Sequence, residues 1–284
     1  MTPMILPPMI LPPMPLPPID TLLDALVATS LEAGAAILRI RRAGLSVEKK
    51  TDHSPVTAAD REAEAIITRA LNAVAPGVPV VAEEAVSAGR IPQVDDTFFL
   101  VDPLDGTREF VKGGNDFTVN IGLVRNGTPS VGVIYVPATG KLYGGSTEEG
   151  AWQAVVADGV VSPRVAMRVR RAPEGPIDIV ASKSHRTKET DDCIARYEVG
   201  RLVSAGSSVK FCVLAAGEAD LYPRMGTTMQ WDTAAGEAIL RAAGGRVVTM
   251  DGKPLPYGPG AAAGEGAYRN PWFIATGGME PLIT

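Results

Sequence analysis

The sequence predicts a mixed α and β protein in two halves, a helix-covered sheet followed by an alternation of strands and helices. In the first half, two amphipathic stretches precede short apolar runs that alternate as strands do. Two of these runs are joined by Asn126-Gly127, a pair typical of a tight β-hairpin. From residue 177 onward, strand and helix patterns take turns, which is typical of α/β proteins. The 284 residues are enough for one large domain or two closely packed ones.

The composition indicates a soluble globular protein. The chain is 45% hydrophobic and 21% charged, and its net charge of −5 argues against a general nucleic-acid binder, which is normally basic. Two histidines and two cysteines, Cys193 and Cys212, argue against a zinc site and a disulfide framework. We therefore expect oxygen-ligated metal chemistry in a reducing cytoplasm, with no transmembrane segment.

Residues 1–18 form a proline-rich stretch, MTPMILPPMILPPMPLPP. Proline this dense prevents a helix and favours extended polyproline II structure. We predict a flexible tail outside the folded part. The alternative is a docking segment for a partner or for the cytoplasmic side of the inner membrane.

Two helices and a series of strands are predicted for the N-terminal half. The first helix runs from Asp20, its expected cap, to residue 43 before Gly44. Its expected inward stripe is Leu23, Leu26, Ser30, Ala33, Ile37 and Leu38. The second runs from Thr57 to before Pro76 and opens with a capping-box pattern that ends at Asp60. Strands are expected at 78–82, 97–101, 117–125, 129–136, 141–146 and 151–156.

The basic, proline-containing stretch 164–176 is the best candidate for a domain boundary. It divides the chain into an N-terminal domain, 19–170, and a C-terminal α/β domain, 171–284. The strands predicted beyond it are 177–181, 200–203 and 220–223, and the helices are 188–197, 207–219 and 232–243.

The stretch VDPLDGT, residues 101–107, carries the main chemical signal. Asp102 and Asp105 stand three residues apart at the end of an expected strand, where two carboxylates can face one hard cation such as Mg²⁺. A turn at Gly106 would also offer backbone N–H groups to an anion. The alternative is an ordinary turn, since Asp, Pro and Gly are common turn residues.

Four further groups of residues have both a structural and a chemical interpretation. Asp60 and the Asp232 of WDTAAG (231–236) can cap helices or serve a site. Glu83-Glu84 is a solvated strand end or a second source of carboxylates. Gly206-Ser207-Ser208 is a helix cap or an anion-binding helix start. In WDTAAG, the aromatic and the small residues would hold the helix start close to another surface.

Taken in order, Asp60, Glu83-Glu84, DPLDGT and WDTAAG resemble the motifs of the Mg²⁺-dependent, Li⁺-sensitive phosphatases, the superfamily of inositol monophosphatase. The resemblance spans about residues 20–277 and implies a layered αβαβα sugar-phosphatase fold. Within the superfamily, GSSVKFCVLAAGEADLYPR (206–224) is most similar to the bacterial 3′(2′),5′-bisphosphate nucleotidases. These act in sulfur metabolism on adenosine 3′,5′-bisphosphate or its 5′-phosphosulfate analogue.

Two positions depart from the nucleotidase pattern. Arg108 stands where Lys is usual, and Ala85 where a third acid is frequent. Inositol-1-phosphate phosphatase therefore remains the alternative activity, with fructose-1,6-bisphosphatase third. A non-catalytic scaffold that recruits a partner through the tail is the alternative from another class.

The resemblance implies a two-metal site. One Mg²⁺ is expected on Glu83, Asp102 and the Leu104 carbonyl, and a second on Asp102, Asp105 and Asp232. Asp102 would bridge the two ions, and Glu83 would also hold a weaker third ion if one binds. Two adjacent ions stabilise both the attacking and the leaving oxygen of an in-line displacement.

The resemblance also implies the catalytic and substrate contacts. Thr107 would orient a metal-bound water, Asp60 would accept the Thr107 hydroxyl hydrogen, and Glu84 would assist near the water. The expected substrate contacts are Glu83, Leu104, Asp105, Gly106, Thr107, His185, Gly206, Ser207, Ser208, Lys210, Arg224 and Asp232. For Lys210 and Arg224 the alternative is solvated surface, and for His185 a structural role. The substrate is expected to be a small nucleotide rather than a nucleic-acid polymer, and the protein a monomer or homodimer.

Overall fold

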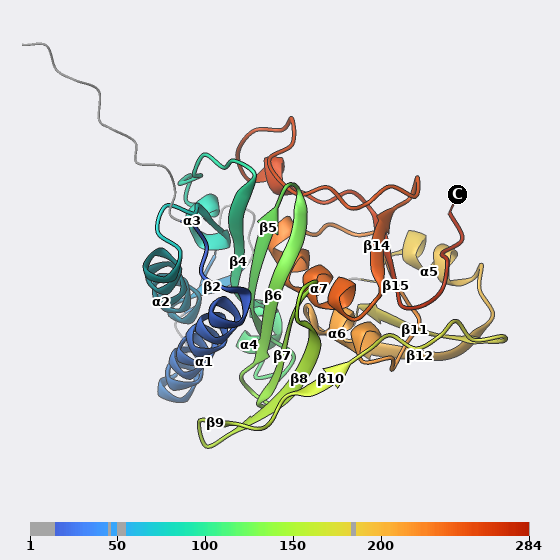
Figure 1. The fold of residues 1–284 in the computed structure, drawn as a ribbon, viewed down its shortest axis with the longest axis horizontal. Helices are drawn as coiled ribbons and strands as arrows, with labels where there is room; N and C mark the ends of the chain where they lie inside the picture. The colour runs from blue at the N-terminus through green and yellow to red at the C-terminus, as the bar shows by residue number, and fades with distance from the viewer. Residues whose placement is uncertain (1–14, 45–46, 50–54, 183–185, 284) are drawn as a thin grey trace, which may run out of the picture.

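Two β-sheets are stacked between three layers of helices in the computed structural model, which describes residues 15–44, 47–49, 55–182 and 186–283. The order of layers is α1 and α2, an eight-stranded sheet, α6 and α7, a five-stranded sheet, and α5 (Figure 1). This five-layer αβαβα arrangement is the fold that the resemblance implied. Residues 1–14 of the proline-rich stretch lie outside the described residues, so the interpretation of the tail stays a prediction.

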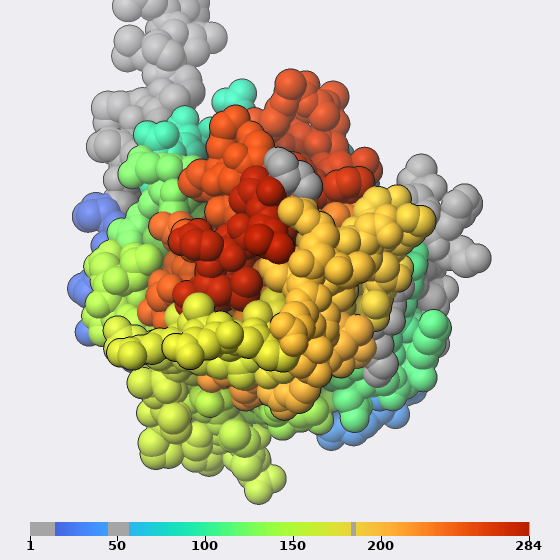
Figure 2. Space-filling model, turned by 90° about the vertical axis from the view of Figure 1, so that its right-hand side faces the viewer, coloured from blue at the N-terminus to red at the C-terminus, as the bar shows by residue number. Residues whose placement is uncertain are grey.

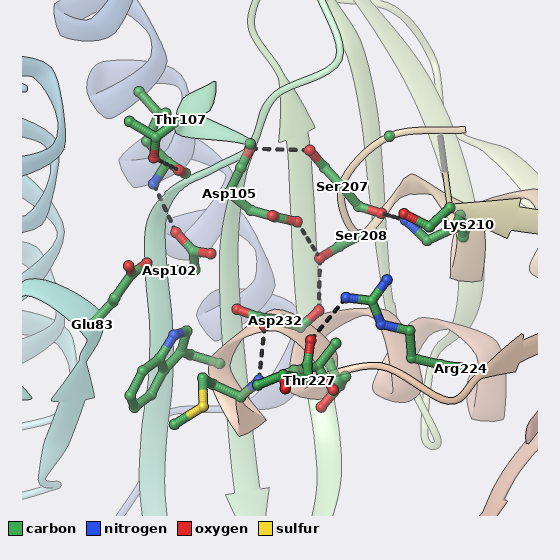
Figure 3. Close-up of a pocket in the computed structure, with 18 of the residues that line it drawn as sticks. Glu83, Asp102, Asp105, Thr107, Ser207, Ser208, Lys210, Arg224, Thr227 and Asp232 are labelled. Carbon is green, nitrogen blue, oxygen red and sulfur yellow. Dashed lines mark hydrogen bonds between the residues drawn. The ribbon is translucent and has the colours of Figure 1, made fainter. Parts of the chain in front are cut away.

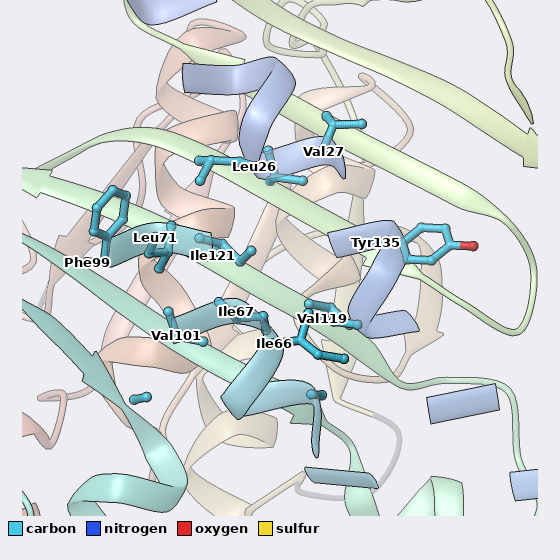
Figure 4. Packing of buried hydrophobic residues seen from close by; sticks show 14 of the residues in the cluster. Leu26, Val27, Ile66, Ile67, Leu71, Phe99, Val101, Val119, Ile121 and Tyr135 are labelled. Atoms are coloured by element: carbon cyan, nitrogen blue, oxygen red, sulfur yellow. The ribbon is translucent and has the colours of Figure 1, made fainter. Parts of the chain in front are cut away.

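The outer helices α1 (Ile19–Ala43) and α2 (Ala58–Val74) pack on each other and on the eight-stranded sheet. The predicted stripe of α1 faces this core, and Figure 4 shows Leu26 and Val27 of α1 with Ile66 and Ile67 of α2. Asp20 does not cap α1. The helix starts one residue earlier, after Pro18, so Asp20 lies in the first turn, where its Oδ1 accepts from the Thr21 nitrogen at 2.6 Å.

Among the described residues, α1 is the one helix long and apolar enough to cross a membrane. Its most apolar window has a mean hydropathy of 1.5, and 56% of that window is buried inside the protein. The apolar residues of α1 are thus accounted for by the core that they form with α2 and the sheet.

The eight-stranded sheet has the order β10-β8-β7-β6-β5-β4-β3, with β9 paired to β8. Its strands are β3 (Val80–Ala82), β4 (Thr97–Asp105), β5 (Thr118–Arg125), β6 (Thr128–Val136), β7 (Lys141–Ser146), β8 (Gly150–Ala157), β9 (Val160–Val161) and β10 (Val165–Met167). Only the β3–β4 pair is parallel. The predicted hairpin joins β5 to β6, where Asn126 and Gly127 have φ angles of 50° and 69°. These left-handed residues match the tight turn expected of Asn-Gly.

Strand β4 continues through the acidic motif instead of ending at Val101 as predicted. Asp102 pairs with Asn120 and Asp105 with Thr118, so β4 has one residue more than β5 between these two pairs. Such a bulge tolerates Pro103, which donates no ladder hydrogen bond. The turn follows at Gly106, whose φ of 93° is left-handed and suits glycine, and the short helix α4 (Thr107–Val111) begins directly after it.

The five-stranded sheet has the order β12-β11-β13-β15-β14. Its strands are β11 (Ile177–Ser182), β12 (Val199–Ala205), β13 (Leu221–Arg224), β14 (Arg246–Thr249) and β15 (Phe273–Thr276). The associated helices are α5 (Lys188–Ile194), α6 (Val209–Ala215), α7 (Gln230–Ala242) and the 3₁₀ helix η1 (Gly264–Tyr268). The predicted alternation is confirmed, but α5 and α6 are shorter than expected. Strands β14 and β15, α3 (Glu83–Ser87), α4 and the β1–β2 pair (Val47–Lys49, Pro55–Thr57) were not predicted.

Helix α7 lies between the two sheets and is buried along almost its whole length. A Cβ on Gly122 of β5 would come within 2.8 Å of the Ala235 nitrogen, and one on Gly132 of β6 would meet the same residue. Small residues in WDTAAG therefore allow the close approach that the sequence predicted. Figure 2 shows the C-terminal half, coloured yellow to red, covering the face beyond this layer.

One hydrophobic cluster includes residues of both halves, such as Phe98 and Ile134 from the first and Trp231 and Phe273 from the second. The eight-stranded sheet ends with β10, and the five-stranded sheet begins with β11, on either side of residue 170. Because the core is shared, the division into domains at 170/171 stays a prediction.

Candidate active site

A cavity of about 420 Å³ opens at the start of α7, between the end of β4 in one sheet and the end of β13 in the other. It is bordered by the end of β4, the loop before α6, the end of β13 and the 3₁₀ helix. The predicted residues that line it are Glu83, Asp102, Leu104, Asp105, Gly106, Thr107, Gly206, Ser207, Ser208, Lys210, Arg224 and Asp232. Figure 3 shows Asp102, Asp105 and Asp232 around one space, with Glu83 beside Asp102. Residues that are more than 120 positions apart in the sequence thus share one cavity.

The acidic side chains of the cavity destabilise one another's charges. Burial raises the pKa of Asp102 well above its ordinary value, and Glu83, Asp105 and Asp232 raise it further. Burial likewise raises the pKa of Asp232 well above its ordinary value, again with Asp105 adding to the effect. Asp102 is only 2% exposed, so water does little to relieve the repulsion on its charge.

The chemistry of these donors fits a hard divalent cation. Carboxylate and carbonyl oxygens are the ligands that Mg²⁺ prefers, and a bound cation would relieve the repulsion among the acids. Among the described residues, however, no three His, Cys, Asp or Glu side chains are grouped as a metal ligand set. The assignment of metal ligands therefore stays a prediction supported by the donor chemistry.

Asp60 and Thr107 form the predicted pair at the edge of the cavity. The Thr107 hydroxyl oxygen lies 3.1 Å from Asp60 Oδ1 and 3.0 Å from the Leu104 carbonyl oxygen. Asp60 Oδ2 also accepts from the backbone nitrogen and the hydroxyl of Thr57, each at 2.7 Å. The capping box and the contact with Thr107 therefore coexist, one on each carboxylate oxygen.

The loop 206–208 docks onto the acidic motif instead of capping a helix. Helix α6 begins only at Val209, and the Ser208 side chain makes no cap hydrogen bond. The Ser208 hydroxyl lies 2.9 Å from Asp105 Oδ2 and 2.7 Å from the Asp232 carbonyl oxygen (Figure 3). The Ser207 hydroxyl lies 3.0 Å from the Asp105 carbonyl oxygen. A Cβ on Gly106 would come within 2.6 Å of the Ser207 hydroxyl oxygen, so only glycine permits this contact.

Lys210 and Arg224 are buried cations and not solvated surface. They are 4% and 7% exposed. Lys210 donates to the Ser207 carbonyl and lies over the Tyr222 ring, 5.3 Å from its centroid. Burial lowers the pKa of Lys210 to about 8, while the charges of Asp105 and Asp232 act in the opposite direction. Arg224 donates to the Thr227 carbonyl oxygen at 2.8 Å. The cavity thus has positive charge on the side opposite Glu83.

Asp232 combines a cap with a place in the cavity. Helix α7 starts at Gln230 and not at 232, so Asp232 is not its first residue; from the third helical position its Oδ2 accepts from the nitrogen of the N-cap residue Met229 at 2.8 Å. The same side chain lines the cavity. As with Asp60, the structural and the chemical interpretation hold together.

Two predicted residues are not among those that the structure brings together. Glu84 lines a neighbouring hollow with Arg61 and Glu64, so its proposed assistance to the water stays a prediction. His185 lies outside the described residues. The cavity also has lining residues that sequence reasoning missed, namely Arg108, Glu109, Ser182, Phe211, Tyr222, Thr227, Thr228, Met229, Trp231, Thr233, Glu265, Gly266 and Arg269. Among these, Phe211, Tyr222, Trp231 and Thr233 lie inside the stretches 206–224 and 231–236, and Arg108 directly follows the acidic motif, whereas no sequence signal marked 265–269.

Comparison with known proteins identifies the class. The sequence profile of the inositol monophosphatase family matches residues 19–277, and the chain belongs to this family. The 3′(2′),5′-bisphosphate nucleotidase CysQ of Escherichia coli O157:H7 is 40% identical over 241 residues, which are 84% of this chain and 94% of that protein. CysQ of Salmonella typhimurium is 38% identical over 257 residues, 90% and 99% of the two chains.

A solved structure agrees with this assignment. CysQ from Bacteroides thetaiotaomicron, a bacterial member of the inositol monophosphatase family, matches with a TM-score of 0.73 and 38% identity, over 92% of this chain and 98% of that one. The family and the fold class implied by the sequence are confirmed.

Proposed function

We propose that this protein is a Mg²⁺-dependent phosphatase that removes the 3′-phosphate of adenosine 3′,5′-bisphosphate to give AMP and phosphate. The observation that carries the proposal is that one cavity holds two buried cations, Lys210 and Arg224, together with the four carboxylates proposed as metal ligands, those of Glu83, Asp102, Asp105 and Asp232. A substrate with two phosphates would place one at the acidic, metal-binding end and the other at the cationic end. The similarity to the bisphosphate nucleotidases of two bacteria supports the same substrate.

The residues proposed to hold Mg²⁺ are Glu83, Asp102, the Leu104 carbonyl, Asp105 and Asp232. When bound, Mg²⁺ supplies positive charge to the transferring phosphoryl group and acidifies water at neutral pH. We propose two ions, and a third if Glu83 also binds one weakly. The charge of the carboxylates in the cavity requires cations of this kind before a phosphate dianion can enter.

The protein groups contribute positioning and proton transfer. The Thr107 hydroxyl donates a hydrogen bond to Asp60 Oδ1, so the Thr107 hydroxyl oxygen is free to accept a hydrogen bond from the attacking water. The backbone N–H groups of Gly106 and Thr107, at the start of α4, would bind the scissile phosphate. Lys210, Arg224 and the loop 206–208 would bind the second phosphate, and positioning of this kind supplies much of the rate in phosphoryl transfer.

The test is Mg²⁺-dependent phosphate release from adenosine 3′,5′-bisphosphate, inositol 1-phosphate and fructose 1,6-bisphosphate, each with and without Li⁺. We expect a preference of about 100-fold in kcat/KM for the nucleotide, equivalent to about 2.7 kcal/mol, and inhibition by Li⁺. A preference for inositol 1-phosphate would keep the metal site and replace the substrate. No release from any of the three would contradict the phosphatase function and favour a scaffold.

A variant of Lys210 tests whether the cationic end of the cavity causes the preference for the nucleotide. Lys210→Met keeps the length of the side chain and removes the charge. It should lower kcat/KM for the nucleotide by 10-fold or more and leave kcat/KM for inositol 1-phosphate nearly unchanged, because that substrate has no second phosphate. Equal loss for both substrates would show that Lys210 does not bind the second phosphate.

A further inference from the structure

Glu64 is a buried acid outside the cavity, with a defined partner. It lies on α2 and is 8% exposed. Its Oε2 accepts from the backbone nitrogen of Glu84 at 2.7 Å, and the backbone nitrogen of Ala85 also donates to this carboxylate. These nitrogens belong to the first turn of α3, where backbone N–H groups have no partner inside the helix. Glu64 therefore caps α3 from a different helix, 20 residues away in the sequence.

Asp60 and Glu64 stand one turn apart on the same face of α2. Asp60 Oδ1 accepts from Thr107, the first residue of α4, just as Glu64 accepts from the first turn of α3. Both α3 and α4 have only five residues, too few to be stable in isolation. Their positions must therefore be fixed by contacts such as these two.

The first residue of α3 is Glu83, which lines the cavity beside Asp102. The charge of Glu83 and a side-chain hydrogen bond from it both raise the pKa of Asp102, so the two carboxyl groups lie in direct contact. A cap on the next two backbone nitrogens holds Glu83 in this contact, because it fixes the backbone from which Glu83 projects.

We propose that Glu64 is a positioning residue that holds Glu83 in place for metal binding by capping α3, while Asp60 on the same helix face positions Thr107. The proposal rests on the proposed function, since it needs Glu83 to be a metal ligand. It assigns α2 the role of a rigid support for two elements of the site.

The test compares Glu64→Ala and Glu64→Gln with the wild type and with Glu62→Ala. Glu62 lies on the same helix, has a side chain that is 43% exposed and pairs with Arg39, so its variant controls for general effects on α2. The readouts are the Kd for Mg²⁺ by calorimetry without substrate, the Mg²⁺ dependence of kcat, and thermal unfolding in EDTA. The calorimetric measurement does not depend on turnover.

Glu64→Ala should raise the Kd for Mg²⁺ by about 10-fold or more, the usual effect of removing a group that orients a metal ligand. Its kcat at saturating Mg²⁺ should stay within about 3-fold of wild type. This pattern distinguishes a positioning role from a general loss of stability, since a merely unstable protein would not show a change in the Mg²⁺ dependence alone. Glu64→Gln retains an acceptor oxygen and should keep the Kd within about 3-fold. Glu62→Ala should match the wild type.

If Glu64→Ala does not fold, Glu64→Asp takes its place with the same expectation, because its carboxylate is withdrawn by one methylene. A normal Kd for Mg²⁺ in a folded Glu64→Ala protein would overturn the inference and leave the proposed function intact. So would an equal loss in Glu64→Ala and Glu64→Gln. A wild type that neither binds Mg²⁺ nor releases phosphate would overturn both.

Discussion

Asp60 uses its two carboxylate oxygens for different partners. Oδ2 accepts from Thr57 and completes the cap of α2, whereas Oδ1 accepts from Thr107 at the cavity. Asp60 is 2% exposed, and burial raises its pKa, which the hydrogen bonds from Thr57 and Thr107 partly reverse. A single substitution at Asp60 therefore cannot separate its effects on stability and on catalysis, but substitutions of its two partners can.

Thr107→Val removes the hydroxyl and keeps the shape of the side chain. We expect turnover to fall by about 10²-fold or more with little change in unfolding, because the cap of α2 is intact. Thr57→Ala should do the reverse, costing on the order of 1 kcal/mol of stability with turnover nearly retained. Asp60→Ala should show both losses. Steady-state kinetics and urea unfolding of the three variants provide the measurement, and unchanged turnover in Thr107→Val would refute the catalytic pair.

At the scale of residues, the sequence was informative where chemistry and local pattern coincide. Asp102, Asp105 and Asp232 stand in short motifs, and the structure brings them to one cavity. Glu64 was missed because an acid four residues after Asp60 on a helix has the pattern of any solvated face. Its role depends on α3, whose existence the sequence did not indicate.

Helix α7 both contributes to the cavity and packs closely against the first sheet. It supplies Asp232 to the cavity and packs its small residues against β5 and β6. Farther along, Glu237 is 1% exposed and accepts from the Tyr257 hydroxyl at 2.9 Å. Tyr257 also lies 2.9 Å from the hydroxyl of Thr233, which lines the cavity. Burial raises the pKa of Glu237 to about 8 from an ordinary 4.5.

The raised pKa of Glu237 predicts a pH dependence of stability. The folded state holds the Glu237 proton more tightly than the unfolded state, so this group lowers the unfolding free energy as the pH rises from about 4.5 to about 8. Glu237→Gln removes this titration. Its unfolding free energy relative to wild type should rise over that range by a few kcal/mol at most, at about 1.4 kcal/mol for each pKa unit.

Urea unfolding at several pH values between 5 and 9 measures this difference, and the other titrating groups cancel between the two proteins. Glu280→Gln serves as the control, because Glu280 is exposed and pairs with Arg246 at the surface. A constant difference between Glu237→Gln and wild type across this range would show that Glu237 does not titrate there.

At the scale of elements, long periodic segments were predicted well and short ones were not. α1, α2 and α7 differ from their predicted bounds by only a few residues, because their apolar periodicity extends over several turns. Helices α3 and α4 have five residues each, too few for a recognisable period. The bulge at Pro103 depends on pairing between β4 and β5, which lies beyond any local pattern.

The cavity as a whole belongs to neither half of the molecule. Asp102 and Asp105 come from the eight-stranded sheet, whereas Ser208, Arg224 and Asp232 come from the second half. The hydroxyl of Ser208 contacts Asp105 across this junction. The pattern of strands and helices predicted two halves, and the resemblance to the phosphatases implied one site shared between them. The layering could not be derived from local patterns, because it depends on the close contact between α7 and the first sheet.

Binding of Mg²⁺ at this junction should therefore stabilise the entire molecule. At 100 times its Kd, a ligand of the folded state adds about 2.7 kcal/mol, which for a chain of this length corresponds to a rise in Tm of roughly 5 °C. We expect one cooperative transition that shifts upward with Mg²⁺ and returns with EDTA, because the ligands come from both halves. Two separate transitions, of which Mg²⁺ shifts only one, would contradict a shared core.

Asp102→Asn provides the matching variant. It should abolish both turnover and the Mg²⁺-induced shift in Tm, since Asp102 is central among the acids of the cavity. In EDTA at neutral pH its Tm should equal or exceed that of wild type, because an uncharged amide avoids the repulsion that Glu83, Asp105 and Asp232 exert on a charged Asp102. Near-normal turnover of this variant in saturating Mg²⁺ would refute the metal assignment. A Tm in EDTA well below that of wild type would show that Asp102 stabilises the fold, and would contradict the view that this residue serves metal binding at a cost in stability.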